Sequence, residues 1–165
     1  MKTKRFYFLH DKLIEDFPEE SAALLINKGN AIVGNHHDRP CYYVFTDENG
    51  IHWMIPLSSQ LDKYHKIFDK NVEKRGYCNS IIFENVLGHE KAFLLQNMFP
   101  VTDEYIREQY TKENHEVKIR YKTEILLEKY AKRIIKKARI GVKNTFTNIM
   151  HMEQKLLEKK KSSSI

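Results

Sequence analysis

The feature that most constrains this fold is a β-hairpin signature in the N-terminal half of the chain. Two runs rich in β-branched and aromatic residues, Cys41–Thr46 and Ile51–Leu57, flank the tetrapeptide Asp47-Glu48-Asn49-Gly50. An Asn-Gly pair between such runs is a strong hairpin marker, because both residues tolerate positive φ angles. Pro40 and Pro56 fall at the ends of the runs, where no ladder N–H is required. The chain is therefore expected to contain antiparallel sheet.

The rest of the sequence is β-rich first and helical later. Short apolar or aromatic runs predict further strands over 4–9, 31–34, 76–83 and 92–95. Apolar spacing and capping residues predict short helical turns over 11–17 and 19–27, and helices over 60–69, 102–110, 116–140 and 144–158. This order favours an α+β fold over an alternating α/β fold.

A length of 165 residues suits a single domain with one hydrophobic core. We expect a β-rich core over about 1–100, a helical part over about 102–160 and a disordered tail over about 161–165. No apolar run approaches the roughly 20 residues that cross a bilayer, and the basic start is interrupted at His10-Asp11-Lys12, unlike a signal peptide. Two cysteines are too few for a disulfide framework. A soluble cytoplasmic protein with no membrane partner is expected.

The charge is unevenly distributed along the chain. Residues 1–115 carry 14 basic and 17 acidic side chains, whereas residues 116–165 carry 14 basic and 5 acidic ones. On the helix predicted over 116–140, one side is basic: Lys129, Lys132, Arg133, Lys136, Lys137 and Arg139. Such a stripe is typical of a face that meets a polyanion such as nucleic acid, and equally of a solvated helix whose lysines favour solubility.

The sequence lacks the familiar motifs of phosphate-binding loops, zinc proteases, serine hydrolases and paired metal-binding cysteines. RNA cleavage is one reaction that needs neither a metal cofactor nor a protein nucleophile, because the 2′-hydroxyl of RNA is the attacking group. The protein has only to align the phosphate, stabilise its developing charge and transfer two protons. Suitable side chains surround the hairpin: Arg39, Ser58, Ser59, Lys63, His65 and Lys66.

Two segments resemble a known family. The hairpin segment, which follows a basic residue and ends in Pro-Leu-Ser-Ser, and the segment AFLLQNMFP over 92–100 are similar to those of the endoribonuclease toxins of type III toxin–antitoxin and phage-abortive systems. The resemblance implies an SH3-like antiparallel β-barrel core of the MazF/Kid type, with added helices and a basic helical C-terminal part. It also implies metal-independent, sequence-selective cleavage that leaves a 2′,3′-cyclic phosphate and a 5′-hydroxyl.

The resemblance further implies partners and site residues. In this family the antitoxin is an RNA pseudoknot that the toxin cuts from a precursor and binds in a closed protein–RNA assembly, and cellular or phage mRNA is the substrate. Ser58 and Ser59 match the family's Thr/Ser-Ser pair, and Arg39 matches a basic residue that is lysine in some members. A guanidinium stays protonated, so Arg39 would bind the phosphate while another group acts as general base. The nearby options are His36, His37, Lys63 and His65.

Other interpretations of the same residues stay open. Ser58 and Ser59 could simply end a strand and cap the next helix. The aromatic residues of the hairpin, Tyr42, Tyr43 and Trp53, are expected in the core rather than as platforms for RNA bases. The chain could also be a non-catalytic RNA-binding module, a DNA-binding regulator with a basic helix in the major groove, or a toxin of similar fold with a protein antitoxin.

Overall fold

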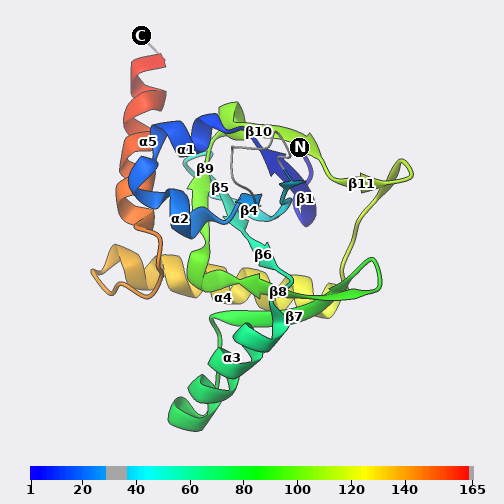
Figure 1. The fold of residues 1–165 in the computed structure, drawn as a ribbon. Coiled ribbons are helices and arrows are strands. Elements are labelled where there is room, and N and C mark those ends of the chain that lie inside the picture. Colours follow the sequence, from blue (N-terminus) through cyan, green and yellow to red (C-terminus); the bar gives the residue numbers. More distant parts are fainter. Residues whose placement is uncertain (29–36, 164–165) are drawn as a thin grey trace.

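A computed structural model of the chain describes residues 1–28 and 37–163, and Figure 1 shows their arrangement. The strand predicted over 31–34 and the candidate residue His36 lie outside the described residues. The strands are β1 (Arg5–Leu9), β2 (Asn27–Lys28), β3 (His37–Asp38), β4 (Cys41–Thr46), β5 (His52–Ile55), β6 (Leu57–Ser58), β7 (Ile81–Val86), β8 (His89–Leu94), β9 (Phe99–Val101), β10 (Ile106–Gln109), β11 (Thr111–Lys112) and β12 (His115–Glu116). The α-helices are α1 (Lys12–Asp16), α2 (Ser21–Leu24), α3 (Leu61–Arg75), α4 (Tyr121–Arg139) and α5 (Ile149–Ser163).

Two antiparallel sheets dominate the described part of the chain. The first has the strand order β10-β1-β4-β5-β9, and the second has the order β6-β8-β7. Two short ribbons, β2–β3 and β11–β12, accompany them. Together with the helices, these sheets confirm the predicted α+β fold class.

The two sheets meet at Pro56, which separates β5 from β6. Proline has no N–H to donate to a ladder, so the pairing of the first sheet cannot continue unbroken through this position. The Pro56 carbonyl instead accepts a hydrogen bond from the Leu94 N–H at 2.9 Å, and β6 then pairs with β8. Because β5 and β6 belong to different sheets, the described strands do not close into one barrel, and the SH3-like barrel is not confirmed.

The predicted hairpin is confirmed, since β4 pairs with β5. The Asp47 carboxylate organises its loop by accepting hydrogen bonds from the backbone N–H groups of Asn49 at 2.9 Å and Ile51 at 3.1 Å, and from the Trp53 indole at 3.0 Å. Of the loop residues, Gly50 has a positive φ of 76° and Asn49 does not. The loop therefore closes as a four-residue turn, in which the Gly50 N–H donates to the Asp47 carbonyl, rather than as a two-residue Asn-Gly turn.

The prediction of a helix over 102–110 is wrong. The acidic residues after Thr102 form only the 3₁₀ turn Asp103–Tyr105, and the chain then continues as β10. Strand β10 pairs antiparallel with β1, with Ile106 opposite Leu9. A helix at this position would leave one edge of β1 without backbone partners, so pairing with a distant strand outweighs the local capping preference.

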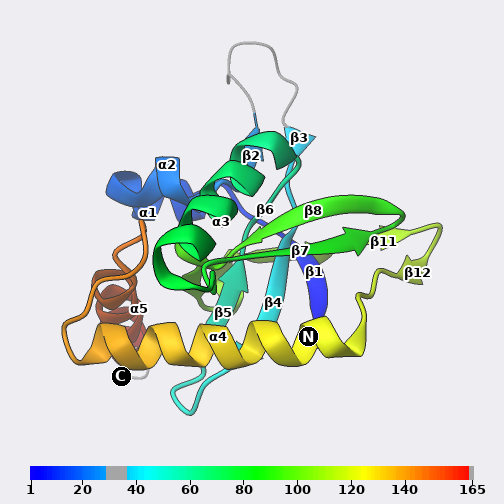
Figure 2. The same ribbon diagram turned by 90° about the horizontal axis from the view of Figure 1, so that it is seen from below.

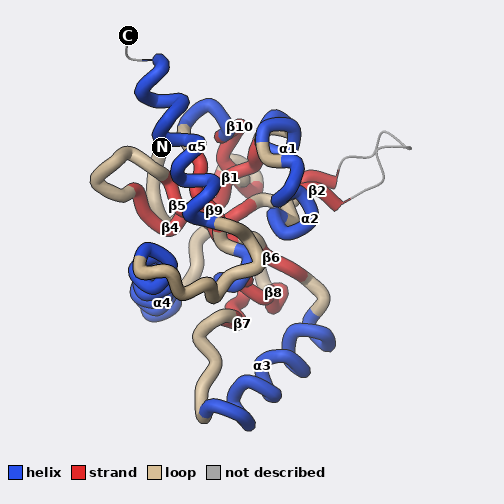
Figure 3. Tube along the Cα trace, turned by 90° about the vertical axis from the view of Figure 1, so that its left-hand side faces the viewer, coloured by secondary structure: helices blue, strands red, loops and turns tan. Residues whose placement is uncertain are grey.

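The helices lie on the outside of the two sheets (Figures 1 to 3). Helix α4 crosses beneath the sheets in Figure 2 and packs on β4, and α5 lies against β9. The buried side of α4 is formed by Thr123, Leu127, Ala131, Ile134 and Ile135. Helix α3 projects from the body of the molecule (Figures 1 and 3). No helix within 1–28 or 37–163 is long and apolar enough to cross a membrane.

The hydrophobic core joins the two sheets through aromatic rings. Trp53 and Tyr42 are fully buried and Tyr43 is 3% exposed, so their predicted core positions are confirmed. The Tyr42 ring centroid lies 5.3 Å from that of Phe6 on β1 and 5.6 Å from that of Phe93 on β8. Aromatic contacts at these distances are favourable beyond the area they bury, and here they hold the second sheet against the first.

Candidate functional site

A groove of about 390 Å³ lies at the junction of the two sheets. Residues from β1, the segment before β4, β6 and the residue after it, the β7–β8 hairpin and the residue that follows β10 contribute to it. Its lining residues are Phe6, Phe8, Arg39, Pro40, Leu57, Ser58, Ser59, Val86, Leu87, His89, Lys91 and Tyr110. The groove therefore combines cations and hydroxyl groups with an apolar and aromatic surface.

Ser58 and Ser59 lie where β6 ends and the chain turns into α3. Ser58 is 5% exposed, and its hydroxyl oxygen accepts a hydrogen bond from the backbone N–H of Gln60 at 3.1 Å. The N-cap of α3 is Gln60, without a side-chain capping bond, so neither serine caps the helix in the usual way. Because its oxygen already accepts a bond, the Ser58 hydroxyl is oriented while its hydrogen can be donated into the groove. Ser59 is exposed and lines the same groove.

Arg39 reaches the groove from the segment that joins β3 to β4. Its backbone N–H donates to the Ile26 carbonyl at 3.0 Å, and Pro40 follows it, which restricts the backbone on both sides. The neighbouring Cys41 is fully buried, and burial raises the pKa of its thiol, so this cysteine is not a nucleophile at neutral pH. The groove thus brings together three of the residues predicted from the sequence, Arg39, Ser58 and Ser59.

Of the other predicted proton-transfer candidates, Lys63 and His65 do not line the groove. His65 lies on α3 with its Nε2 atom 3.0 Å from a carboxylate oxygen of Glu90, and its ring stacks on Phe83 with centroids 3.8 Å apart. Lys63 lies in the first turn of α3, exposed to solvent, with its ammonium 5.3 Å from the Tyr64 ring centroid. His36 belongs to the residues that the structure does not describe.

Two residues of β8, His89 and Lys91, line the groove, although the sequence alone did not identify them as site residues. Ser58 is paired with Ala92, so Ser59 and Lys91 are each the chain neighbour of a member of this pair. No motif links positions 89–91 to positions 58–59. The alternation of side chains along β8 shows that His89 and Lys91 share one face of the strand. It does not show which strand pairs with β8, so it could not link these residues to Ser58 and Ser59.

The apolar lining of the groove contains an aromatic pair. The rings of Phe8 and Tyr110 contact edge to face, with centroids 5.6 Å apart and an interplanar angle of 82°. The guanidinium of Arg107 lies 5.2 Å from the Phe8 ring centroid, which adds a cation–π contact on this ring. Leu87 lines the same groove and is 45% exposed. Aromatic rings beside cations and hydroxyls are the surface that single-stranded nucleic acid requires.

The basic stripe predicted on α4 is exposed along its whole length: Lys129, Lys132, Arg133, Lys136, Lys137 and Arg139. Its last member has a structural role, because the Arg139 guanidinium lies 3.5 Å from Glu153 of α5 and 3.7 Å from Asp47 of the hairpin loop. Lys132 lies 3.7 Å from Glu128 on the same helix, a weak exposed pair. On α3, Lys66 is exposed as well.

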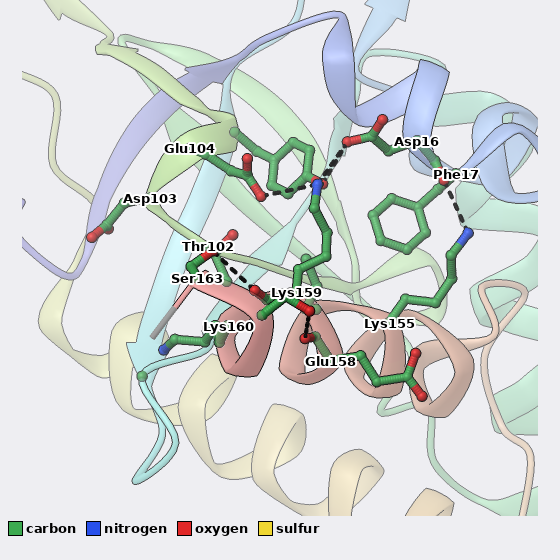
Figure 4. A pocket seen from close by; sticks show the side chains of 14 residues that line it. Asp16, Phe17, Thr102, Asp103, Glu104, Lys155, Glu158, Lys159, Lys160 and Ser163 are labelled. Carbon is green, nitrogen blue, oxygen red and sulfur yellow. Dashed lines mark hydrogen bonds and ion pairs between the residues drawn. The ribbon is translucent and has the colours of Figure 1, made fainter. Parts of the chain in front are cut away.

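A larger cavity, of about 970 Å³, lies beside α5 and is shown in Figure 4. The Lys159 ammonium lies 2.9 Å from the Tyr105 hydroxyl and 3.2 Å from both Asp16 and Glu104. Burial raises the pKa of Tyr105 to about 12, and a hydrogen bond from Tyr105 lowers the pKa of Asp16. Since Lys159 of α5 already pairs with both carboxylates, we interpret this cluster as the attachment of α5 to the body rather than as a binding site.

Comparison with known proteins identifies a solved structure of similar fold. No family model matches the sequence, and no curated protein matches it. The solved structure of AbiQ, a lactococcal anti-phage endoribonuclease belonging to the type III toxin–antitoxin system, superposes with a TM-score of 0.65 at 15% sequence identity. The match covers 97% of this chain and 99% of the AbiQ chain. The chain therefore shares the fold of AbiQ, and the resemblance seen in its sequence is confirmed at the level of the fold.

Proposed function

We propose that this protein is a metal-independent, sequence-selective endoribonuclease toxin of a type III toxin–antitoxin system, acting in the cytoplasm. The observation that supports this most is the groove in which Arg39, Ser58, Ser59, His89 and Lys91 line one surface. These side chains are cations, hydroxyl donors and one imidazole, the groups that bind a phosphodiester and transfer the two protons of its cleavage. AbiQ, which has the same fold, is an anti-phage endoribonuclease.

The proposed reaction is an attack by the RNA on itself. The 2′-hydroxyl oxygen forms a bond to the adjacent phosphorus, and the bond between phosphorus and the 5′-oxygen breaks. One proton leaves the 2′-hydroxyl and one proton joins the 5′-oxygen, so the products are a 2′,3′-cyclic phosphate and a 5′-hydroxyl. Arg39 and Lys91 would neutralise the phosphate oxygens, and Ser58 and Ser59 would donate hydrogen bonds that strengthen as negative charge develops.

Among the candidate proton-transfer groups, His89 fits the proposed reaction best. It lines the groove, whereas Lys63 and His65 lie on α3 outside it. An imidazole can accept a proton on one nitrogen and donate one from the other near neutral pH. We therefore expect His89→Gln to abolish cleavage. His65→Gln, which changes the same residue type outside the groove, serves as the matched control and should retain activity.

The partner would be RNA in two forms, an mRNA substrate and a pseudoknot antitoxin that closes a protein–RNA assembly. The exposed lysines of α4, together with Lys66 on α3, would bind the phosphates of either RNA. A tandem-repeat array upstream of the coding sequence would support the RNA antitoxin. A small protein-coding gene in that place would instead support a protein antitoxin.

The proposed function is tested by incubating the purified protein with RNA in excess EDTA. Products with a 2′,3′-cyclic phosphate and a 5′-hydroxyl are expected, together with complete resistance of a substrate that has a single 2′-deoxy sugar at the cut. Ser59→Ala should slow cleavage about 100-fold or more, on the order of the loss of one transition-state donor, whereas the exposed control Ser162→Ala should not. RNA binding without any cleavage by the unsubstituted protein would favour a non-catalytic RNA-binding module.

A further inference from the structure

Leu87 lies at the tip of the β7–β8 hairpin, where leucine is disfavoured both by the backbone conformation and by exposure to water. Val86 pairs with His89, so the turn consists of Leu87 and Gly88 alone. Both have positive φ angles, 52° for Leu87 and 81° for Gly88, which is the pattern of a type I′ turn. Asn or Asp is preferred at the first position, because a bulky side chain is strained in the left-handed region.

Leu87 is also 45% exposed, so burial in the core does not compensate for this strain. Local backbone preference and contact with water both favour an asparagine at this position. Residues held in unfavourable backbone regions concentrate at functional sites, where they serve something other than stability. The side chain of Leu87 lines the groove, which gives it a role that an asparagine would not fill.

The same groove is lined by the Phe8–Tyr110 pair, with the guanidinium of Arg107 over the Phe8 ring. Proteins that read single-stranded RNA hold unstacked bases against aromatic, arginine and apolar side chains. The neighbouring Arg39, Lys91 and serine hydroxyls suit the phosphate that is joined to such a base. A polar lining and an apolar lining in one groove therefore match the two halves of a nucleotide.

We propose that Leu87, Phe8 and Tyr110 form a nucleobase subsite that holds the base next to the scissile phosphate and contributes to the choice of cleavage sequence. This inference rests on the proposed function, because it assumes that the polar part of the groove binds an RNA phosphate. The occupant is a base of single-stranded RNA, since a duplex keeps its bases stacked on one another and away from the protein.

Three variants test the subsite. Leu87→Asn removes the apolar side chain while it keeps a residue that tolerates the turn, so its urea midpoint should equal or exceed that of the unsubstituted protein. Tyr110→Leu removes the aromatic ring but keeps an apolar side chain. Val142→Asn is the matched control, because Val142 is 47% exposed and lies outside the groove lining.

Cleavage is measured on an RNA oligonucleotide and on copies with an abasic nucleotide on either side of the cut. Loss of one base stack corresponds to a fall in kcat/KM of about 5- to 150-fold. We expect Tyr110→Leu to show this fall, Leu87→Asn to show a smaller one, and Val142→Asn to show none. On one of the abasic substrates the variants should be no slower than the unsubstituted protein, because the base they would contact is missing.

Binding supplies a readout that does not depend on cleavage. A 2′-O-methyl oligonucleotide with 2-aminopurine at successive positions should show quenched fluorescence at one position, and Tyr110→Leu should relieve it. Suppose that the unsubstituted protein cleaves RNA, and that Leu87→Asn and Tyr110→Leu cleave it at the same rate and with the same base preference. This result would overturn the subsite and leave the proposed function standing. Quenching that depends on Tyr110 without cleavage would support the subsite and overturn the enzyme. If the unsubstituted protein shows neither cleavage nor quenching, both the subsite and the proposed function are overturned.

Discussion

Replacing Glu84 by glutamine tests how α4 is attached to the second sheet. Glu84 lies on β7 with only 2% of its side chain exposed. Its carboxylate accepts hydrogen bonds from the Arg120 Nε at 2.9 and 3.1 Å, from the Thr123 hydroxyl, and from the backbone N–H of Asn85 at 2.8 Å. Arg120 and Thr123 belong to the start of α4, so one buried charge fixes the first turn of the helix to the sheet.

The size of the effect follows from the exposure of the partners. A hydrogen bond to a charged group contributes about 1.5–3 kcal/mol, but the Arg120 side chain is 72% exposed and regains water when its partner is removed. Glutamine keeps the shape of Glu84 and one acceptor, so we expect Glu84→Gln to lower the free energy of unfolding by about 2 kcal/mol. Arg120→Ala leaves the carboxylate buried with fewer donors and should cost about as much, although the residue it removes is exposed.

The same interaction predicts a pH dependence with a defined sign. Desolvation raises the pKa of Glu84, but the hydrogen bonds from Thr123 and Arg120 outweigh it and hold the pKa below the ordinary value of 4.5. A carboxyl whose pKa is lowered by folding stabilises the fold fully above its unfolded pKa and loses that contribution as the pH falls through its folded pKa. Glutamine does not titrate, so the stability difference between the two proteins should shrink below about pH 4.5.

Urea unfolding measures these differences, with the single fully buried tryptophan, Trp53, as the fluorescent reporter. The double variant Glu84→Gln/Arg120→Ala should be destabilised by less than the sum of the two single effects, because each single change already breaks the shared ion pair. Equal urea midpoints for Glu84→Gln and the unsubstituted protein at pH 7 would refute this reasoning. A stability difference that stays constant as the pH falls well below the ordinary glutamate pKa of 4.5 would refute its electrostatic part.

Three further outcomes concern α5, the hairpin loop and the α4 stripe. Lys159→Met should destabilise the protein by about 1–3 kcal/mol in urea unfolding, because it leaves the Tyr105–Asp16 hydrogen bond without its cation; an unchanged midpoint would show that α5 is held elsewhere. Gly50→Ala should cost about 1 kcal/mol, since its φ of 76° strains a side chain, while a stabilised variant would contradict the turn geometry. When glutamine replaces Lys132, Arg133, Lys136 and Lys137, filter binding of single-stranded RNA should show a salt-dependence slope reduced by about 0.7 for each phosphate that these cations neutralise; no change in slope would place the α4 stripe away from RNA.

The secondary-structure elements that depend on residues close together in the chain could be predicted from the sequence. The hairpin strands of β4 and β5, the aromatic strand β1 and the amphipathic helix α4 each depend on residues close together in the chain. The helix predicted over 102–110 failed because β10 is held by β1, which lies far earlier in the chain, and the local Thr-Asp-Glu signal decided only one 3₁₀ turn. Tertiary pairing outweighs a propensity that is worth only tenths of a kcal/mol per residue.

The candidate site divides in the same way. Arg39, Ser58 and Ser59 flank the hairpin, so their proximity could be expected once the hairpin was recognised. His89 and Lys91 depend on the pairing of β6 with β8, whose register no local pattern specifies. His65, by contrast, has a suggestive position in the sequence, but the helix that begins after Ser59 turns it toward Glu90 and Phe83.

The groove exists because the chain changes sheets at Pro56. If β5 continued through position 56 in one ladder, Ser58 and Ser59 would extend the first sheet, and β8 would have no strand with which to bring His89 and Lys91 alongside them. The break therefore brings the hydroxyls of Ser58 and Ser59 into one groove with Arg39, which leads into the first sheet, and Lys91, which belongs to the second. Because the polar groups come from both sheets, we expect the width of the groove to depend on the aromatic cluster of Phe6, Tyr42 and Phe93 that joins the sheets. A change in that core would thus alter the proposed chemistry without touching any residue that performs it.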